Sequence, residues 1–227
     1  MTSKKSIALA VIFVSGLALV HFAAAQTAAS VIITWQAQNY FPADFPGKAS
    51  ITPGSQVKAA VEELSGNRLV NLSQAQISWF VNDNLIQSGV GLKSISFAAN
   101  PDPNGLVNIR VQVQTGNSSN TNSISVTASP PFAVIDYPAV QKNIPSGSKV
   151  TFTAWPYFFN VNSLSDLKFT WQLSGQTITS SGNQLVLDVG TPLTANQQML
   201  PVTLTTQNTQ NPLEFSRTVS VFNIIGK

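Results

Sequence analysis

The main pattern along the chain is an alternation of apolar and polar positions with a period of two. Ile77, Trp79 and Val81 are spaced in this way, with polar Ser78 between the first two. The same spacing recurs in further runs: Phe169, Trp171 and Leu173; Ile95 and Phe97; Ile124 and Val126; Val150 and Phe152; Leu185, Leu187 and Val189; Val219 and Val221. A period of two is that of a β-strand, so each run predicts a strand with one buried face.

Residues that favour turns separate these runs. They are Asn82-Asp83-Asn84, residues 100–105, Gly116-Asn117 and Ser174-Gly175. Asn, Asp, Gly and Pro adopt the backbone angles that tight turns require. No helical stripe of apolar positions appears after residue 25, so the pattern predicts an all-β fold.

The chain also resembles itself, because three segments of its first half share residue types with three of its second half. The pairs are Leu72–Trp79 with Leu164–Trp171 at an offset of about 92 residues, Gly54–Val57 with Gly147–Val150 at about 93, and Val107 and Ile109 with Val202 and Leu204 at about 95. This period is too long for a solenoid repeat and suits a whole β-sandwich domain. Ser129-Pro130-Pro131 interrupts the strand pattern, so we expect domains at 26–129 and 130–227.

Residues 1–25 have the layout of an export signal. Met1–Lys5 is positively charged, Ser6–Val20 is apolar, and Ala23–Ala25 supplies the small residues that signal peptidase cleaves after. The alternative is a retained anchor, because residues 6–25 are long enough to span about 30 Å of hydrocarbon. Either way, we expect the rest of the chain in the periplasm, at the cell surface or outside the cell, with membrane contact only through an uncleaved N-terminus.

The charge pattern argues against a nucleic-acid partner. The chain has 12 Lys and Arg against 9 Asp and Glu, and its charged residues make up only 9% of the sequence. Lys4 and Lys5 lie in the N-terminal segment, and the other cations are scattered singly, whereas binding phosphates requires clustered cations. The absence of cysteine excludes disulfides and an acylated lipobox, so packing alone must stabilise the domains.

Each half of the repeat has a lead-in with proline and glycine, a first core strand and, about 23 residues later, a hydrophobic-x-Trp strand that ends in a polar turn. This order resembles strands B, C and C′ of Ig-like and PKD-like bacterial surface domains. The opening Trp35–Pro42, followed by Gly47-Lys48, is similar to a segment of uncharacterised secreted Ig-like proteins of candidate-phyla bacteria. The resemblance covers nearly all of residues 30–227 and implies two tandem immunoglobulin-like β-sandwich domains after an N-terminal signal or anchor helix. We expect Trp79 and Trp171 to be core anchors.

Residues for catalysis are scarce. His21 is the single histidine and lies in the N-terminal segment, so the remainder has neither histidine nor cysteine, which excludes Ser-His-Asp and Cys-His systems and common zinc sites. Glu62 and Glu63 are adjacent on an expected strand and point to opposite faces, and we expect Glu63 to be a solvated strand-end residue. Asn82-Asp83-Asn84 and residues 100–105 lack the alternating acidic ligands of a calcium loop. We expect no catalytic, cofactor-binding or metal-binding residues and no enzyme activity.

Trp155, Tyr157, Phe158 and Phe159 belong to an aromatic run expected in the loop between strands B and C of the second domain. The matching stretch of the first domain, Leu64–Arg68, is polar. An exposed aromatic loop can stack on sugar rings or dock a protein. The alternative is that the run caps the core or packs on the neighbouring domain.

Tyr40, Phe41 and Phe45, interspersed with Pro42 and Pro46, form a second aromatic cluster. They are expected either to rim the joint between the domains or to bind a partner. Together these features favour a non-catalytic exported envelope or cell-surface protein acting as a structural or protein-interaction module, with an envelope protein or a glycan as partner. The alternatives are a carbohydrate-binding adhesin that uses the aromatic loop, and a two-domain periplasmic chaperone.

Overall fold

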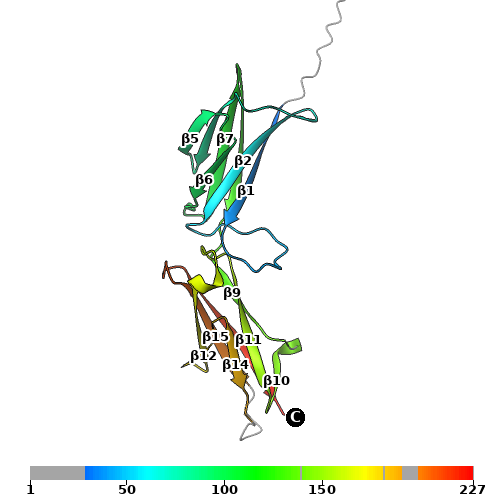
Figure 1. The fold of residues 1–227 in the computed structure, drawn as a ribbon, viewed down its shortest axis with the longest axis vertical. Helices are drawn as coiled ribbons and strands as arrows, with labels where there is room; N and C mark the ends of the chain where they lie inside the picture. Colours follow the sequence, from blue (N-terminus) through cyan, green and yellow to red (C-terminus); the bar gives the residue numbers. More distant parts are fainter. Residues whose placement is uncertain (1–28, 139, 181, 191–198, 227) are drawn as a thin grey trace, which may run out of the picture.

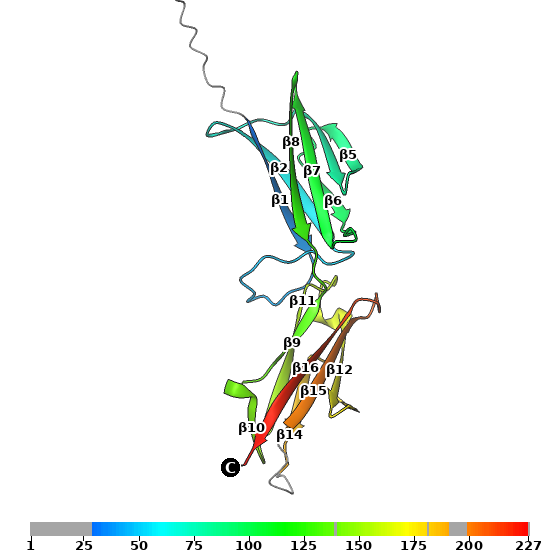
Figure 2. The ribbon, with the colours of Figure 1, turned by 180° about the vertical axis from the view of Figure 1, so that it is seen from behind.

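The computed structural model describes residues 29–226, with gaps at 139, 181 and 191–198, and these residues form two β-sandwiches arranged end to end (Figures 1 and 2). Burial alternates along the strands as the sequence pattern predicts. In β4 (Gln76–Val81), for example, Ile77, Trp79 and Val81 are buried and the residues between them are not. The predicted all-β fold with tandem immunoglobulin-like domains is confirmed. The segment 1–25, predicted to be a signal or an anchor, lies outside the described residues.

The first sandwich packs two antiparallel sheets against each other. One contains β1 (Ser30–Gln38), β2 (Gln56–Ser65) and β6 (Ser94–Ala98), with β2 in the middle and the short β3 (Arg68–Leu69) paired to its end. The other has the order β5-β4-β7-β8, with β5 (Asn84–Val90), β7 (Leu106–Thr115) and β8 (Ser118–Thr127). This is the A-B-E against C′-C-F-G arrangement of Ig-like domains.

The second sandwich repeats this plan. One sheet has the order β14-β11-β9, with β9 (Phe132–Asp136), β11 (Lys149–Tyr157) and β14 (Gln184–Asp188). The other has the order β10-β16-β15-β12-β13, with β10 (Asn143–Pro145), β12 (Leu167–Leu173), β13 (Gln176–Ile178), β15 (Met199–Asn208) and β16 (Phe215–Ile225). β10 runs parallel to β16. Two 3-10 turns, Val140–Lys142 and Leu164–Asp166, lie in the connections, and no helix within the described ranges is long and apolar enough to cross a membrane.

A tryptophan occupies the centre of each core. Trp79 on β4 and Trp171 on β12 are both fully buried. β4 pairs with the ten-residue strand β7, and β12 pairs with the ten-residue strand β15. The indole Nε1 of Trp79 donates to the carbonyl of Leu92 at 2.9 Å, whereas the Nε1 of Trp171 has no hydrogen-bond partner. The two tryptophans thus occupy equivalent places with different polar environments.

The matched Gly54 and Gly147 also occupy equivalent places. Both have positive φ, +85° and +69°, and each lies two residues before an equivalent strand, β2 or β11. Their amides donate to Ala99 and Val189, the residues that follow β6 and β14. Glycine adopts this backbone conformation without steric cost, which explains why it is common to both copies.

Two expectations from the sequence are wrong. Val219 and Val221 of β16 face outward, because the larger Phe222 and Ile224 fill the core from the opposite phase of the same strand. Glu63 is buried rather than solvated. β2 extends past Glu63 to Ser65, and the Glu63 Oε1 accepts a hydrogen bond from Asn120 Nδ2 at 2.6 Å.

Candidate interaction site at the domain joint

A backbone bridge links the two domains. The loop after β1, blue in Figure 1, reaches toward the second sandwich and brings Tyr40 beside Phe159. The Tyr40 N–H donates to the Phe159 carbonyl at 2.8 Å, and the Phe158 N–H donates to the Tyr40 carbonyl at 2.6 Å. Burial raises the pKa of the Tyr40 hydroxyl above its usual value. The joint therefore contains the hydrogen-bond pattern of a short antiparallel ladder.

An aromatic cluster fills the space around this bridge. Phe45 from the first domain makes edge-to-face contacts with Phe41, Tyr157 and Phe158, with ring centroids 5.6–5.8 Å apart. Phe132, at the start of β9, stacks on Tyr157 with centroids 4.9 Å apart and an interplanar angle of 13°. Aromatic pairs of this geometry stabilise beyond their buried area. Five rings from both domains thus meet in one apolar contact, which we call the joint cluster.

The aromatic run of the second domain is not a loop, which corrects the sequence-based expectation. Trp155 and Tyr157 belong to β11, where Trp155 pairs with Val134 and Tyr157 with Phe132. The strand ends at Tyr157, and the next residue, Phe158, has a φ of +64°, which turns the chain so that Phe159 is fully buried. The alternation of β11 continues as far as Tyr157, because β9 offers backbone partners up to that residue.

Asn160 connects the two domains through its side chain. Its Nδ2 donates to the Pro53 carbonyl at 2.9 Å, and its Oδ1 accepts from the Thr52 hydroxyl at 3.1 Å. Its backbone N–H donates to Glu214 Oε1 at 2.8 Å, and Glu214 Oε2 accepts from Asn208 Nδ2 at 2.6 Å. Both oxygens of the buried Glu214 carboxylate are therefore used to hold the residue that clamps the first domain.

The sequence had not singled out Asn160, Glu214 or Phe132. Asn160 directly follows the aromatic run and Phe132 directly follows the proline pair, so position in the chain was the available signal. Glu214 lies between Leu213 and Phe215 in a loop, and nothing in its neighbours indicates burial. These residues become recognisable when the two domains are placed together.

Trp155 stands apart from the joint cluster. It projects from the outer face of the β14-β11-β9 sheet and is half-buried, and its Nε1 lies 3.5 Å from Asp136 Oδ2. Val134, the pairing partner of Trp155, is exposed beside it. Of the aromatic residues at 155–159, Trp155 therefore presents its ring most directly to a ligand.

A hollow of about 330 Å³ lies between the linker, the first domain and the second domain. Its lining combines prolines of the linker and of the first domain with the loop before β16: Pro53, Pro130, Pro131, Asn211, Leu213, Glu214 and Phe215. Leu213 and Phe215 are exposed there. The two prolines restrict the backbone between β8 and β9, which limits the linker to few conformations.

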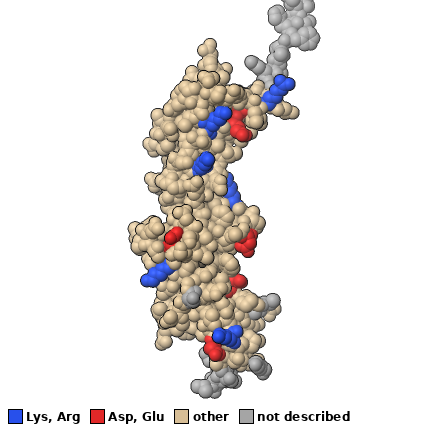
Figure 3. Space-filling model, in the orientation of Figure 1, with Lys and Arg blue, Asp and Glu red and all other residues tan. Residues whose placement is uncertain are grey.

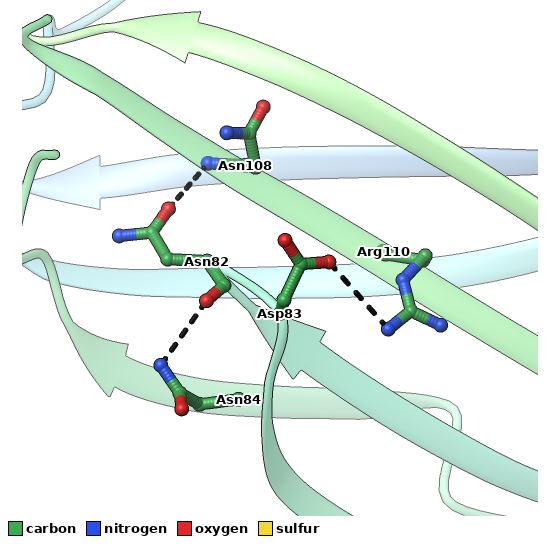
Figure 4. Close-up of polar contacts among 5 residues, drawn as sticks. All are labelled: Asn82, Asp83, Asn84, Asn108 and Arg110. Atoms are coloured by element: carbon green, nitrogen blue, oxygen red, sulfur yellow. Dashed lines mark hydrogen bonds and ion pairs between the residues drawn. The ribbon is translucent and has the colours of Figure 1, made fainter.

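The cluster Asn82-Asp83-Asn84 forms a hairpin turn (Figure 4). Asn82 Oδ1 accepts from the Asn108 N–H at 2.9 Å, and Asn84 Nδ2 donates to the Asn82 carbonyl at 3.1 Å. Asp83 pairs with Arg110 at 3.7 Å. Both oxygens of Asn82 thus accept hydrogen bonds, from β7 and from the turn itself. Among the described residues, no three His, Cys, Asp or Glu side chains come together as metal ligands would.

Charged side chains are sparse on the surface. Figure 3 shows the few blue and red side chains of one face spread over both domains, with uncharged residues covering most of the area. The one ion pair in the described part of the chain is Asp83–Arg110. Lys48 places its ammonium 3.4 Å from the centre of the Trp35 ring, and burial lowers the pKa of this lysine.

The sequence matches no protein-family model and no curated protein. Among solved structures, the fibronectin(III)-like modules of Clostridium thermocellum CbhA align at 13% identity and a TM-score of 0.28, covering 86% of this chain and 94% of theirs. Immunoglobulin domains 1–4 of Sidekick-1 align at 12% and 0.29, covering 88% and 70%. The tandem Ig repeats of Dlar align at 11% and 0.27, covering 88% and 99%. Since these TM-scores lie below 0.5, we assign the fold from the chain's own sheets and cores.

Proposed function

We propose that the chain is an exported, non-catalytic protein whose two Ig-like domains form a stiff spacer that presents interaction surfaces at a fixed distance. The observation that carries this proposal is the joint, where the Tyr40–Phe159 bridge, the joint cluster and the Asn160 contacts all link the same two domains. A module that only tethered two domains would need none of these contacts.

The three kinds of contact oppose bending in different ways. Rotating one domain about the linker would break the two hydrogen bonds of the bridge and separate Phe45 from Tyr157 and Phe158. It would also leave the Asn160 side chain and the Pro53 carbonyl without their partner. Losing these hydrogen bonds and aromatic contacts together costs free energy, so the end-to-end arrangement is favoured.

Export and the absence of catalysis have separate support. The N-terminal sequence has the layout of an export signal, and a neutral polar surface suits proteins of the cell envelope. Outside the N-terminal segment the sequence has neither histidine nor cysteine, and the described acidic residues do not cluster. An assembly role at a bacterial envelope, as the resemblance implies, is part of the proposal.

Spin-label distance measurements test the stiffness directly, because the cysteine-free chain gives no background labelling. Lys58→Cys and Lys168→Cys place one label on an exposed strand position of each domain. A narrow distance distribution is expected, and it should broaden when Phe45→Ala and Asn160→Ala are combined. A broad distribution in the otherwise unchanged chain would overturn the spacer.

Crosslinking in cells tests the location. A C-terminally tagged chain is crosslinked, and the captured proteins and the chain's own N-terminal peptide are identified by mass spectrometry. Envelope partners with a mature terminus at Gln26, or with an intact anchor, support the proposal. Capture of cytoplasmic proteins alone contradicts it.

A glycan-binding role is the second candidate, and the half-buried Trp155 on the outer face of β11 favours it. Its ring lies beside the Asp136 carboxylate, and an aromatic face next to a hydrogen-bond acceptor suits neutral sugars. Trp155→Ala should abolish binding to an oligosaccharide array, with the melting temperature nearly unchanged. Val186→Ala, an exposed residue on the same sheet face, is the control and should bind normally. Array binding that survives Trp155→Ala would exclude this site.

A further inference from the structure

A hollow lies on the outer face of the first domain, over the sheet that contains β1, β2 and β6, and its volume is about 670 Å³. This volume is within the range of small-ligand sites, about 300–1,000 Å³. Figure 3 shows blue and red side chains near one another on the first domain. We call this depression the sheet hollow, and its lining includes Thr34, Lys58, Ala60, Glu62, Lys93 and Ser94.

Small side chains form the floor of the sheet hollow. Ala60 of β2 pairs with Thr34 of β1 on one side and with Ser94 of β6 on the other, so these three residues form one row across the sheet. Longer side chains flank the row, because Lys58 and Glu62 lie two residues before and after Ala60 and therefore on the same face. The short side chains between the long ones leave room for a ligand.

One end of the sheet hollow is closed where β2 has no full neighbouring strand. β6 pairs with β2 as far as Ala60, and β3 pairs with it from four residues later. Between them the Val61 N–H donates to the Lys93 carbonyl at 2.9 Å, which holds the backbone of Lys93 beside the hollow. Leu69 of β3 also lines the hollow and is 66% exposed. The hollow thus has a charged and an apolar wall.

The equivalent strand of the second domain has different residues at these positions. At the offset of 93 that aligns the starts of β2 and β11, Lys58 and Ala60 correspond to Thr151 and Thr153. The lysine and the small floor residue are therefore features of the first domain and not requirements of the sandwich.

The charges of the sheet hollow are available to a ligand. The one ion pair among the described residues joins Asp83 to Arg110, so Lys58, Lys93 and Glu62 are not paired within that part of the chain. Two ammonium groups and one carboxylate give the hollow a net charge of +1. A lysine ammonium binds a carboxylate as a point charge, and a carboxylate accepts hydrogen bonds from hydroxyl groups.

We propose that the sheet hollow binds an acidic polysaccharide, in which sugars that carry a carboxylate alternate with neutral sugars. The carboxylate pairs with Lys58 and Lys93. The sugar hydroxyls bond to Thr34, Ser94 and the Glu62 carboxylate, and the exposed Leu69 packs on the apolar face of a ring. This site adds a ligand to the first domain of the proposed spacer and uses no residue of the joint.

Glu62 and the position of the hollow favour a glycan over other anions. A nucleic-acid strand has one phosphate per 3.4 Å, so it would bring a negative charge against Glu62. A peptide that lay across the face of a sheet would leave its backbone N–H and C=O groups without sheet partners. A sugar chain with spaced carboxylates avoids both costs.

Titration calorimetry with the purified chain tests the proposal. The probe is a short oligosaccharide of glucuronate alternating with N-acetylglucosamine, and the N-acetylglucosamine oligomer of the same length is the uncharged comparison. The acidic probe should bind more tightly than the uncharged one, and added salt should weaken its binding. Lys58→Gln and Lys93→Gln should each raise its dissociation constant about tenfold, because each removes a charge-assisted contact.

Two further variants separate the site from general charge effects. Ala60→Phe fills the floor without changing any charge and should abolish binding, with a nearly unchanged melting temperature because residue 60 lies on the outer face. Lys149→Gln is the matched control, since Lys149 is an exposed lysine on the equivalent strand of the second domain, and it should bind like the unmodified chain.

Several results would overturn the proposal. They are no binding of the acidic probe, equal binding of the acidic and the uncharged probes, and binding that survives Ala60→Phe or both lysine substitutions. Single-stranded DNA and an oligoglutamate peptide are the competing anions, and tighter binding of either one would show that the ligand is not a glycan. These titrations do not depend on the stiffness of the joint, so the spacer and the sheet hollow can fail separately.

Discussion

The ring of Phe45 lies directly against the backbone of Gly47. A β-carbon at position 47 would fall 2.5 Å from Cζ and 2.8 Å from Cε1 of that ring. No pair of carbon atoms tolerates such an approach, so the ring reaches its place in the joint cluster because residue 47 has no side chain. One glycine in a surface loop thus governs the contact between the two domains.

Gly47→Ala is therefore expected to displace Phe45 and loosen the joint. Overpacking of this kind typically costs about 1–3 kcal/mol. The interdomain spin-label distribution should broaden while the unfolding of each sandwich changes little. Gly147→Ala is the matched control in the second domain, because no atom of the described residues lies within 4 Å of the added β-carbon. An unchanged distribution for Gly47→Ala would mean that Phe45 does not restrain the domains.

The two core tryptophans are expected to respond differently to the same substitution. Trp79→Phe removes a hydrogen bond to the Leu92 carbonyl, whereas Trp171→Phe removes an N–H that has no partner. The lost volume is the same, so Trp79→Phe should lower the free energy of unfolding by about 1 kcal/mol more. Urea unfolding of both variants, with each domain followed separately, measures the difference. Equal losses would show that the hydrogen bond contributes nothing.

The sequence predicted the strands and both core tryptophans, because side chains of a β-strand point alternately to the two faces of a sheet and burial therefore alternates with the same period of two. It could not fix strand alignment between the copies. The match at an offset of about 95 aligned Ile109 with Leu204. In the structure Leu204 pairs with Trp171, and the residue that pairs with Trp79 is Val111. The equivalent of Leu204 is therefore Val111, two residues after Ile109. A slip of two leaves every side chain on the same face, so the apolar pattern cannot detect it.

For the joint, the sequence offered alternatives and could not choose between them: Tyr40, Phe41 and Phe45 were expected to rim the joint or to bind a partner, and the run 155–159 to form a binding loop, to cap the core or to pack on the neighbouring domain. The pattern identified Tyr40, Phe41 and Phe45 and the run 155–159 as unusual aromatic segments, without showing that they meet. Asn160 and Glu214 look like ordinary polar loop residues. Their roles depend on contacts between segments more than 50 residues apart. Such contacts are set by how the domains stack, which local patterns do not encode.

The two buried glutamates provide a third prediction. Both carboxylate oxygens of Glu214 accept hydrogen bonds, from Asn160 and Asn208, whereas Oε2 of Glu63 accepts none. Glu214→Gln would place an amide N–H₂ against a donor, and the expected loss is about 1–3 kcal/mol. Glu63→Gln should cost less than Glu214→Gln in thermal unfolding.

Glu62→Gln is the control for this comparison. Glu62 precedes Glu63 on the same strand and is exposed, so its substitution should leave the melting temperature unchanged. The prediction fails if Glu63→Gln destabilises the chain as strongly as Glu214→Gln does.

The turn between β4 and β5 offers a stabilising substitution. Asn82 and Asp83 have φ values of +48° and +63°, the left-handed conformations of a two-residue hairpin turn that favours Asn-Gly. Asp83→Gly removes the steric strain of a side chain at the second position. It also removes the ion pair with Arg110, which is worth little because the Asp83 side chain is almost fully exposed. We expect the first domain to gain about 0.5 kcal/mol in its free energy of unfolding, measured by urea unfolding.

Asp83→Asn separates the two effects, since it removes the ion pair but keeps a side chain that tolerates the turn. Its stability should stay close to that of the unmodified chain. A loss of stability in Asp83→Gly would show that the ion pair, and not the backbone, determines this turn.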